Sequence, residues 1–269
     1  MIKLNDQEIT PTIFPDDTSQ VWKLPLTLIK QIESSTSGLD IVWHFDHEGE
    51  LIHLLQLMTL IRSLNVEVDV CLTLPYLPYA RQDKEVSNDA TFALHTFLGL
   101  IAPVFDSLVV FDPHSEELLE QYFGDGLTCV EPCAEIQVAI DGCNAEVICF
   151  PDVSASTRYP SLAGKPFVYM EKVRNQSTGE ITGMKMHGEA DVTDKCVLIV
   201  DDLCDGGRTF REASKILYYQ DAEEVNLYVS HGIFSHYLGV MILHEDGINQ
   251  VYTEEGLVSD VREHTKAAK

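Results

Sequence analysis

The sequence predicts an α/β protein of two similar halves, each a mainly parallel sheet flanked by helices. Short apolar runs alternate with longer segments whose apolar residues recur at helical spacing, a pattern typical of parallel strands covered by helices. A second series of runs begins after about residue 126, and the 269-residue chain is long enough for two modest domains. We therefore expect one domain over residues 1–128 and another over residues 129–269.

The first half contains three short apolar runs, each followed by a segment with apolar residues at helical spacing. We expect strands at residues 39–43, 66–74 and 107–111, and helices at residues 50–64, 90–102 and 115–123. Alternation of this kind predicts βαβ units, whose strands pair in parallel.

The second half repeats this scheme with apolar runs that read as strands. We expect strands at residues 145–149, 167–169, 197–200 and 225–229, and a helix at residues 210–219 between the last two. Open sheets of this kind bind ligands at the carboxyl ends of their strands. Residues that directly follow these strands are therefore the first candidates for a functional site.

Charge and cysteine usage limit the partners and the compartment. The chain has 18 Lys and Arg against 43 Asp and Glu, a formal net charge of −25. Phosphate backbones and anionic lipid surfaces repel such a chain, so we expect neither nucleic acid nor membrane as a partner. The seven cysteines are scattered, which favours free thiols in a reducing compartment. With no leader-like start and no apolar stretch of spanning length, the sequence predicts a cytoplasmic protein.

The most informative segment runs from Val197 to Thr209, where an apolar strand meets two adjacent carboxylates, a glycine-containing turn and a helix. Glycines let backbone N–H groups curl around an anion, and the helix N-terminus adds a favourable dipole. Thr209 can cap the helix and donate to a phosphate oxygen. Carboxylates beside a phosphate suit ribose hydroxyls or a metal ion. An acidic strand end before an ordinary turn is the alternative interpretation.

This segment resembles the phosphoribosyl-diphosphate loop of type I phosphoribosyltransferases and of ribose-phosphate pyrophosphokinases. The resemblance implies two tandem phosphoribosyltransferase-like domains. It also implies that the ribose hydroxyls are bound by Asp201 and Asp202, and the 5′-phosphate by Asp205, Gly206, Gly207, Arg208 and Thr209. Arg208 replaces a glycine of the usual pattern. Its side chain either points to solvent or extends the site toward a larger 5′ group such as a diphosphate.

Two segments of the first half resemble the ATP-binding parts of the pyrophosphokinases. The segment Leu74–Lys84 is similar to their Pro-Tyr-x-x-Tyr-Ala-Arg-Gln-Asp loop, which implies ATP contacts by Arg81, Gln82 and Asp83. Near the start, Phe14-Pro15-Asp16 resembles a hairpin that reaches the adenine of a neighbouring subunit. Phe14 and Asp16 are therefore further ATP candidates, although Asp17 and Thr18 replace the Gly and Glu of the family pattern.

Metal and catalytic candidates follow from three shorter matches. His114 in Asp112-Pro113-His114 matches an Asp-x-His motif whose His binds the Mg²⁺ of MgATP, whereas a structural histidine is the alternative. Asp152 resembles the Asp of a Pro-Asp-x-Gly-Gly turn that binds metal or ribose, and Arg158 matches a family arginine. Lys172 and Arg174 match the two catalytic positions at the entry of a flexible loop spanning residues 172–188.

The resemblance covers residues 14–258 and implies a Mg²⁺-dependent enzyme. It would transfer the β,γ-diphosphate of ATP, its co-substrate, to the C1 hydroxyl of ribose 5-phosphate and release AMP. A 5′-extended acceptor such as ADP-ribose, a phosphoribosyltransferase and a catalytically silent regulatory relative remain as alternatives. The family also implies a homo-oligomer with the ATP site near a subunit interface. Compared with typical members, we expect this chain to lack an N-terminal segment and part of the C-terminal end.

Overall fold

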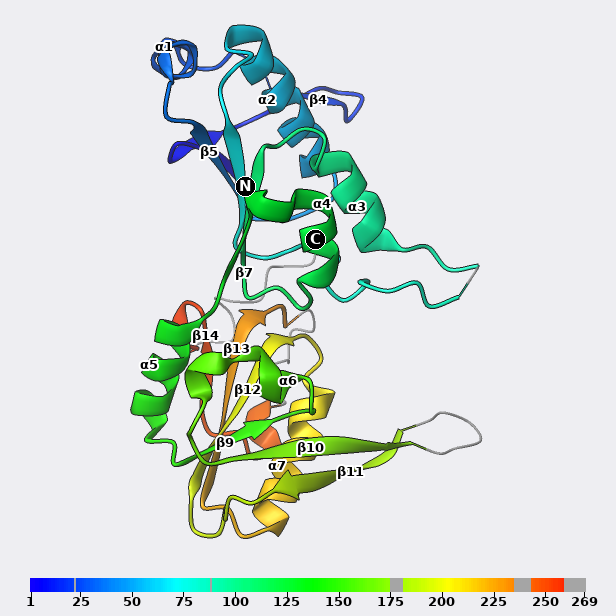
Figure 1. Ribbon diagram of the computed structural model, residues 1–269, viewed down its shortest axis with the longest axis vertical. Helices are drawn as coiled ribbons and strands as arrows, with labels where there is room; N and C mark the ends of the chain where they lie inside the picture. The colour runs from blue at the N-terminus through cyan, green and yellow to red at the C-terminus, as the bar shows by residue number, and fades with distance from the viewer. Residues whose placement is uncertain (22, 88, 175–180, 235–242, 259–269) are drawn as a thin grey trace. The chain divides into compact units, whose positions relative to one another are not determined.

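The computed structural model describes residues 1–21, 23–87, 89–174, 181–234 and 243–258, without the side chains of residues 174, 181 and 182. The chain divides into two compact units, unit 1 (Met1–Val130) and unit 2 (Glu131–Lys269). Figure 1 draws unit 1 in blue to green and unit 2 in green to red. The domain limits 1–128 and 129–269 stay a prediction, because compactness alone does not show that either part folds independently.

Unit 1 is built around a six-stranded, mainly parallel sheet. Its order is β2-β1-β5-β6-β7-β8. The strands are β1 (Ile2–Leu4), β2 (Gln7–Ile9), β5 (Leu39–Trp43), β6 (Val70–Leu74), β7 (Ser107–Phe111) and β8 (Leu127–Val130). Strands β5 to β8 pair in parallel, whereas β1 pairs antiparallel with β2 and β5. The carboxyl ends of β5, β6 and β7 therefore lie side by side at one edge.

Four helices and a small hairpin complete unit 1. They are α1 (Leu26–Ser34), α2 (Glu50–Leu64), α3 (Ala93–Ile101) and α4 (Glu117–Phe123), with the hairpin β3 (Thr12–Ile13) and β4 (Ser19–Gln20). In α2, Leu54, Leu57, Met58 and Ile61 recur at helical spacing and are at most 1% exposed. This stripe packs into one core cluster with the strands and the other helices.

Unit 2 contains a seven-stranded sheet of order β11-β10-β9-β12-β13-β14-β15. Its strands are β9 (Val147–Phe150), β10 (Phe167–Arg174), β11 (Ile181–Gly188), β12 (Cys196–Cys204), β13 (Glu224–Gly232), β14 (Val251–Thr253) and β15 (Gly256–Leu257). The five strands from β10 to β14 along this order are parallel, and the strands at both edges are antiparallel. The helices are α5 (Cys133–Cys143), α6 (Ala155–Arg158) and α7 (Arg208–Tyr219).

The sheet of unit 2 is covered on both faces, which explains why β12 is apolar at every position from Val197 to Val200. Val197 and Ile199 pack with α7 in one cluster, whereas Leu198 and Val200 pack with α5 and α6 in another. Successive side chains of a strand point to opposite faces, so these alternating residues define an α7 face and an α5/α6 face. The predicted α/β class, with two mainly parallel sheets flanked by helices, is confirmed (Figure 1).

The structure corrects several predicted element limits. β10, β12 and β13 continue past their predicted ends, because their polar residues pair with a neighbouring strand. β6 starts at Val70 rather than residue 66, and α3 starts at Ala93 rather than residue 90. Helices α1 and α5 were not predicted, although the buried residues of α5 recur at helical spacing. Within the described ranges, no helix combines the length and apolarity needed to cross a membrane.

Candidate functional site

Three of the predicted site segments of unit 2 lie at the carboxyl-terminal ends of neighbouring parallel strands, one after its strand and two within the last residues of theirs. β9 pairs with β12 on one side, with Cys149 opposite Ile199, and with β10 on the other, with Phe150 opposite Tyr169. Toward the carboxyl end from these paired residues lie Asp152 after β9, Asp201 in β12 and Lys172 in β10. The sheet topology therefore brings these three predicted residues to one edge, where ligands of open α/β sheets bind.

Asp152 shapes the turn that leads from β9 into α6. Its Oδ1 accepts hydrogen bonds from the backbone N–H of Ala155 and from Oγ of Ser154, both at 2.9 Å. An Asp that accepts bonds from following residues in this way fixes the start of a helical turn. The structure thus gives Asp152 a local structural task, and its predicted role as a metal ligand stays a prediction.

Asp201 and Asp202 lie inside β12, which ends at Cys204, and not beyond the strand end as predicted. Nη1 of Arg158 lies 2.6 Å from Oδ1 of Asp202 and 3.5 Å from Oδ1 of Asp201. Burial, together with the neighbouring charge of Asp202, raises the pKa of Asp201 well above the ordinary range of an aspartate. The two carboxylates and one guanidinium form a mostly buried ionic cluster.

The glycine turn joins β12 to α7, and its two glycines differ in their surroundings. Gly207 has φ +67°, and a Cβ at this position would lie 2.8 Å from Cδ2 of Leu243. A Cβ on Gly206 would meet open space. Gly207 is the N-cap of α7, and no side chain of the described residues caps this helix, so the predicted capping by Thr209 is wrong. The first turn of α7 contains no acidic residue, which leaves its N–H groups suited to an anion.

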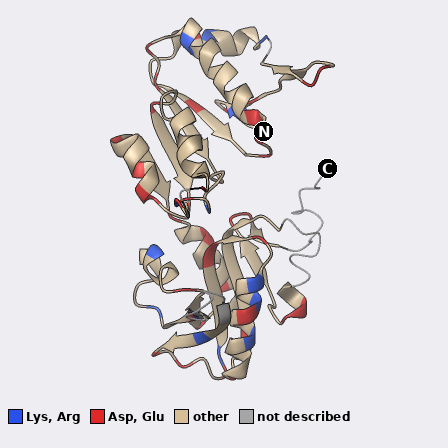
Figure 2. Cartoon of the chain, turned by 90° about the vertical axis from the view of Figure 1, so that its right-hand side faces the viewer, with Lys and Arg blue, Asp and Glu red and all other residues tan. Residues whose placement is uncertain are grey.

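The remaining predicted phosphate-binding residues flank this turn. Asp205 and Thr209 are half-buried, whereas Arg208 is exposed at the first position of α7. Exposure leaves the Arg208 guanidinium accessible to a ligand that extends beyond the turn. Figure 2 shows that basic residues are few throughout the described part of the chain, so each accessible cation is a distinctive feature.

Lys172 lies in a β-strand, which corrects the predicted loop from residue 172 to residue 188. β10 and β11 form an antiparallel hairpin in which Lys172 pairs with Met184 and Glu171 pairs with Lys185. Met170 is buried among the α7-face residues, and alternation places Lys172 on the same face. The loop was expected from the resemblance to a flexible catalytic loop, and the pairing of the two polar strands is not visible in the local sequence. The Arg174 side chain and residues 175–180 lie outside the described part of the chain.

In unit 1, the predicted ATP loop follows β6. Tyr79 adopts φ +63° and its carbonyl accepts a hydrogen bond from the N–H of Gln82 at 2.8 Å. The Tyr79 hydroxyl donates to Oε1 of Glu48 at 2.8 Å, and its ring contacts Phe97. Burial and this hydrogen bond raise the pKa of Tyr79 to about 12. The tyrosine thus anchors a turn from which Arg81 and Gln82 project as exposed side chains, followed by half-buried Asp83.

His114 follows the neighbouring strand β7 and therefore lies at the same edge of the sheet as the Arg81 loop. It is half-buried, and the preceding Asp112 is 4% exposed with φ +38°. The N–H of Asp112 donates to the carbonyl of Val130 in β8, the last strand of unit 1, at 2.9 Å. Among the described residues, no group of three or more His, Cys, Asp or Glu gathers in a way that could hold a metal.

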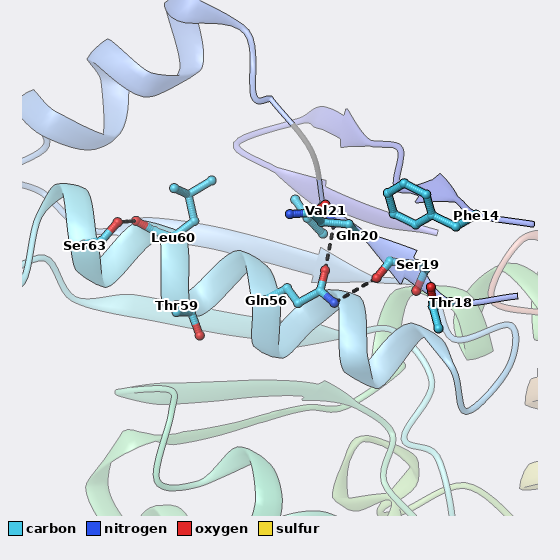
Figure 3. A pocket seen from close by; sticks show the side chains of 9 residues that line it. All are labelled: Phe14, Thr18, Ser19, Gln20, Val21, Gln56, Thr59, Leu60 and Ser63. Atoms are coloured by element: carbon cyan, nitrogen blue, oxygen red, sulfur yellow. Dashed lines mark hydrogen bonds between the residues drawn. The ribbon is translucent and has the colours of Figure 1, made fainter. Parts of the chain in front are cut away.

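The Phe14–Thr18 segment forms the tip of the β3–β4 hairpin. Asp16 Oδ1 accepts bonds from the Thr18 N–H at 3.2 Å and the Thr18 hydroxyl at 2.7 Å. A cavity of about 660 Å³ lies between this hairpin and α2 (Figure 3). Gln56 holds the two together by bonding the backbone of Val21 and of Ser19. The residues that line the cavity are uncharged, and Phe14 is the one predicted site residue among them.

Sequence reasoning gave no role to Arg158 or Tyr79, which the structure places in the candidate sites. Arg158 contacts both acidic residues of β12, and Tyr79 fixes the turn before Arg81. The signal for Arg158 was its match to an arginine of the family. Its partners cannot be found from sequence alone, because the contact depends on β9 and β12 being neighbours in the sheet.

Comparison with known proteins finds similarity to a family model, to sequence relatives and to a solved structure. A family model described as phosphoribosyl transferase domain matches residues 153–236. Ribose-phosphate pyrophosphokinases of Sulfurisphaera tokodaii and Saccharolobus solfataricus are both 29% identical, covering 82% and 81% of this chain and 75% and 74% of their own lengths. A crystal structure of phosphoribosylpyrophosphate synthetase from Mycobacterium smegmatis has a TM-score of 0.63 at 23% identity, covering 76% of this chain and 66% of that chain.

The matches agree with each other and with the sheet topology. The structural likeness shows the fold, and the two sequence relatives extend over most of this chain and about three quarters of their own lengths. The matched domain model covers α6, the β10–β11 hairpin, β12 and α7, which are the elements that carry the candidate site of unit 2. The chain is therefore a divergent relative of the ribose-phosphate pyrophosphokinases, a group of transferase enzymes, and its two mainly parallel sheets flanked by helices match the fold of the phosphoribosylpyrophosphate synthetase.

Proposed function

We propose that this chain transfers the β,γ-diphosphate of ATP to the C1 hydroxyl of a phosphorylated ribose and releases AMP. The observation that carries the proposal is the carboxyl edge of the unit 2 sheet. There, one glycine turn follows a strand that carries two acidic side chains and leads into a helix that no described side chain caps, and a lysine lies on the α7 face two strands away. Such an edge offers separate groups for a phosphate, for ribose hydroxyls and for a transferred diphosphate.

In the proposed reaction the C1 oxygen attacks the β-phosphorus of ATP in line and AMP leaves. Positioning and neutralisation of phosphate charge account for most catalysis of this type. Lys172 and Arg174 are assigned to the charge that develops on the transferred and leaving groups. Arg81, Gln82 and Asp83, with Phe14 and Asp16 of the hairpin, are assigned to ATP. Asp201, Asp202 and residues 205–209 are assigned to the acceptor.

We assign Mg²⁺ as an ion that arrives with the nucleotide. Mg²⁺ is commonly held by one or two protein ligands together with substrate phosphates and water. Among the described residues no group of three or more possible ligands gathers, and His114 of unit 1 and Asp152 of unit 2 are each assigned to the ion by their resemblance to the family motifs. When bound, Mg²⁺ supplies charge neutralisation at the phosphate oxygens.

Ribose 5-phosphate is the first proposed acceptor, and the accessible Arg208 favours ADP-ribose as a second. The guanidinium is exposed at the start of α7, directly after the turn assigned to the 5′-phosphate. A 5′-diphosphate carries an additional anionic group, which an arginine can bind with two parallel hydrogen bonds. Both acceptors present the same C1 hydroxyl, so the chemistry is unchanged.

The test incubates the full chain with MgATP and either acceptor, and quantifies AMP and the diphosphorylated product by ion-exchange chromatography. We expect equimolar AMP and product with at least one acceptor. Reactions without acceptor and with 5-phosphoribosyl diphosphate plus a purine base serve as controls. Activity in the second control without ATP would indicate a phosphoribosyltransferase. ATP binding without AMP from either acceptor would indicate a silent regulatory relative, and either result refutes the proposal.

The family resemblance also supports a homo-oligomer with the ATP site near a subunit interface, and a cytoplasmic location. The exposed position of Phe14 at the tip of the β3–β4 hairpin is compatible with contact across an interface. Analytical ultracentrifugation of the full chain tests this assignment, because a monomer at assay concentration would contradict it.

A further inference from the structure

Arg158 joins two elements at the candidate acceptor site. It is the last residue of α6, and its Nη1 lies within 4 Å of both acidic side chains of β12. The exposed fraction of the side chain is 20% for Arg158, 18% for Asp201 and 5% for Asp202. Ion pairs this far from solvent depend strongly on their partners, because losing one partner leaves a charge without compensation in a poorly solvated place.

The two carboxylates are not equivalent. Strand alternation places Asp202 on the α5/α6 face with Leu198 and Val200, whereas Asp201 lies on the α7 face with Val197 and Ile199. Asp202 therefore makes the shorter of the two contacts with Arg158, and its side chain is nearly fully buried. Asp201 has more exposed surface and lies on the face from which the glycine turn enters α7. Asp201 is thus the better placed carboxylate for a ligand, and Asp202 is the one that holds Arg158.

Charge balance explains why Asp201 needs Arg158. Burial and the adjacent Asp202 raise the pKa of Asp201, and the Arg158 guanidinium opposes that rise. A protonated Asp201 loses its negative charge and with it the strong hydrogen bonds that a carboxylate accepts from hydroxyl groups. The Asp152 turn at the start of α6 fixes the element on which Arg158 is carried.

We propose that Arg158 is a positioning residue of the acceptor site, which holds Asp202 in place and favours the carboxylate form of Asp201, the form that would accept hydrogen bonds from the hydroxyl groups of a phosphorylated ribose. This inference rests on the proposed function for the identity of the ligand. Arg158 itself touches neither the ligand nor the reacting atoms in this assignment. Its effect passes through the two aspartates.

The charged groups that act on Asp201 are Asp202 of the same strand, which raises its pKa, and Arg158 of α6, which opposes that rise. Tyr159 acts on the Arg158 guanidinium. Strand alternation places Lys172 of β10 on the same face of the sheet as Asp201, and the residue opposite Asp201 in β13 is the apolar Val229. Removing Arg158 takes away the cation, so the pKa of Asp201 rises further. If ligand binding requires an ionised Asp201, the variant loses binding at a higher pH than the wild type when the solution is acidified.

The experiment measures ribose 5-phosphate binding by calorimetry without ATP, between pH 5 and 9, for the wild type, Arg158→Met, Arg158→Lys and Lys195→Met. Lys195 is the matched control, because it forms a 2.7 Å ion pair with Glu146 just before the opposite end of β12. We expect Arg158→Met to weaken binding about tenfold or more and to move the acid limb of the binding curve to higher pH. Arg158→Lys should restore part of both effects, and Lys195→Met should change neither.

A second measurement separates this inference from the proposed function. Carbon NMR of the Asp201 carboxyl group, assigned with Asp201→Asn, follows its titration without any ligand or turnover. A higher pKa of Asp201 in Arg158→Met but not in Lys195→Met supports the positioning role of Arg158 even if the wild type turns over no acceptor. Absence of turnover would contradict the proposed reaction alone. An unchanged Asp201 titration, or ribose 5-phosphate binding in Arg158→Met with wild-type affinity and pH dependence, overturns the role of Arg158. If Arg158→Met does not fold, the same comparison is made with Arg158→Lys, which must then show the smaller shift.

Discussion

The two units place their candidate sites at equivalent positions but build them differently. Both use turns that follow neighbouring parallel strands. In unit 2 the acidic residues are inside β12, are mostly buried and are held by Arg158, and Gly207 of the turn packs against Leu243. In unit 1 the cationic end of the loop is exposed, and its shape depends on backbone turns and on Tyr79.

The two candidate sites therefore differ in whether their charged side chains have partners within the protein. The proposed acceptor site of unit 2 carries its own counter-charge, so its side chains are arranged before a ligand binds. The loop of unit 1 presents Arg81 to solvent, and in the proposed function its counter-charge comes from the bound nucleotide. We therefore expect substitutions in unit 2 to affect both folding and ligand binding, and substitutions in the unit 1 loop to affect chiefly the nucleotide.

The largest effect is expected for Lys172→Ala. Removing a preorganised cation from the transferring phosphate commonly lowers the rate by about two to three orders of magnitude. ATP and ribose 5-phosphate binding should change little, because Lys172 is assigned to charge that develops in the transition state. Turnover is measured by AMP release and ATP binding by calorimetry. Lys185→Ala is the control on the opposite face of the same hairpin, and equal turnover in the two variants would refute the assignment.

The sequence predicted the elements whose full length is apolar or periodic. β5, α2 and β7 have the predicted limits, because their burial pattern extends from end to end. The polar ends of β10 and β12 were not predicted as strand. Lys172 and Asp201 are held in extended structure by pairing with distant segments, and local propensity contains no information on that pairing. The candidate residues were therefore found by type and spacing, whereas their backbone state was not.

The contacts that organise the candidate site were the least predictable part. Arg158 contacts Asp201 and Asp202 because β9 and β12 are neighbours in the sheet, although α6 and the β10–β11 hairpin lie between these two strands in sequence. A sequence pattern can nominate a scarce arginine but cannot choose its partner among 43 acidic residues. The strand order makes that choice. Sequence resemblance therefore identifies candidate ligand contacts more readily than the residues that hold them.

An intermediate effect is expected at the glycine turn, where the two glycines separate folding from binding. Gly207→Ala forces a Cβ into a positive-φ position against Leu243, so we expect the free energy of unfolding to fall by about 2 kcal/mol. Gly206→Ala meets open space and should change stability by less than about 0.5 kcal/mol. Its methyl group should instead weaken ribose 5-phosphate binding. Urea unfolding and calorimetry distinguish the two, and equal destabilisation by both variants would contradict the geometry.

The smallest effect is expected for Tyr79→Phe in unit 1. The substitution keeps the ring contact with Phe97 and removes the hydroxyl bond to Glu48, which is worth about 0.5–1.5 kcal/mol. We expect the KM for ATP to rise about two- to fivefold while the KM for the acceptor stays constant. Because the pKa of Tyr79 is about 12, the hydroxyl stays protonated below pH 10 and the effect should be flat between pH 6 and 9.

The control for this last variant is Tyr122→Phe, which removes a 2.8 Å hydroxyl contact with His95 elsewhere in unit 1. It should leave both KM values unchanged. A loss of folding stability in Tyr79→Phe as large as that in Gly207→Ala would mean that the unit 1 loop is as firmly built into the core as the unit 2 turn. The contrast between a preformed acceptor site and a nucleotide loop completed by its ligand would then be wrong, because both sites would depend on buried contacts to the same degree.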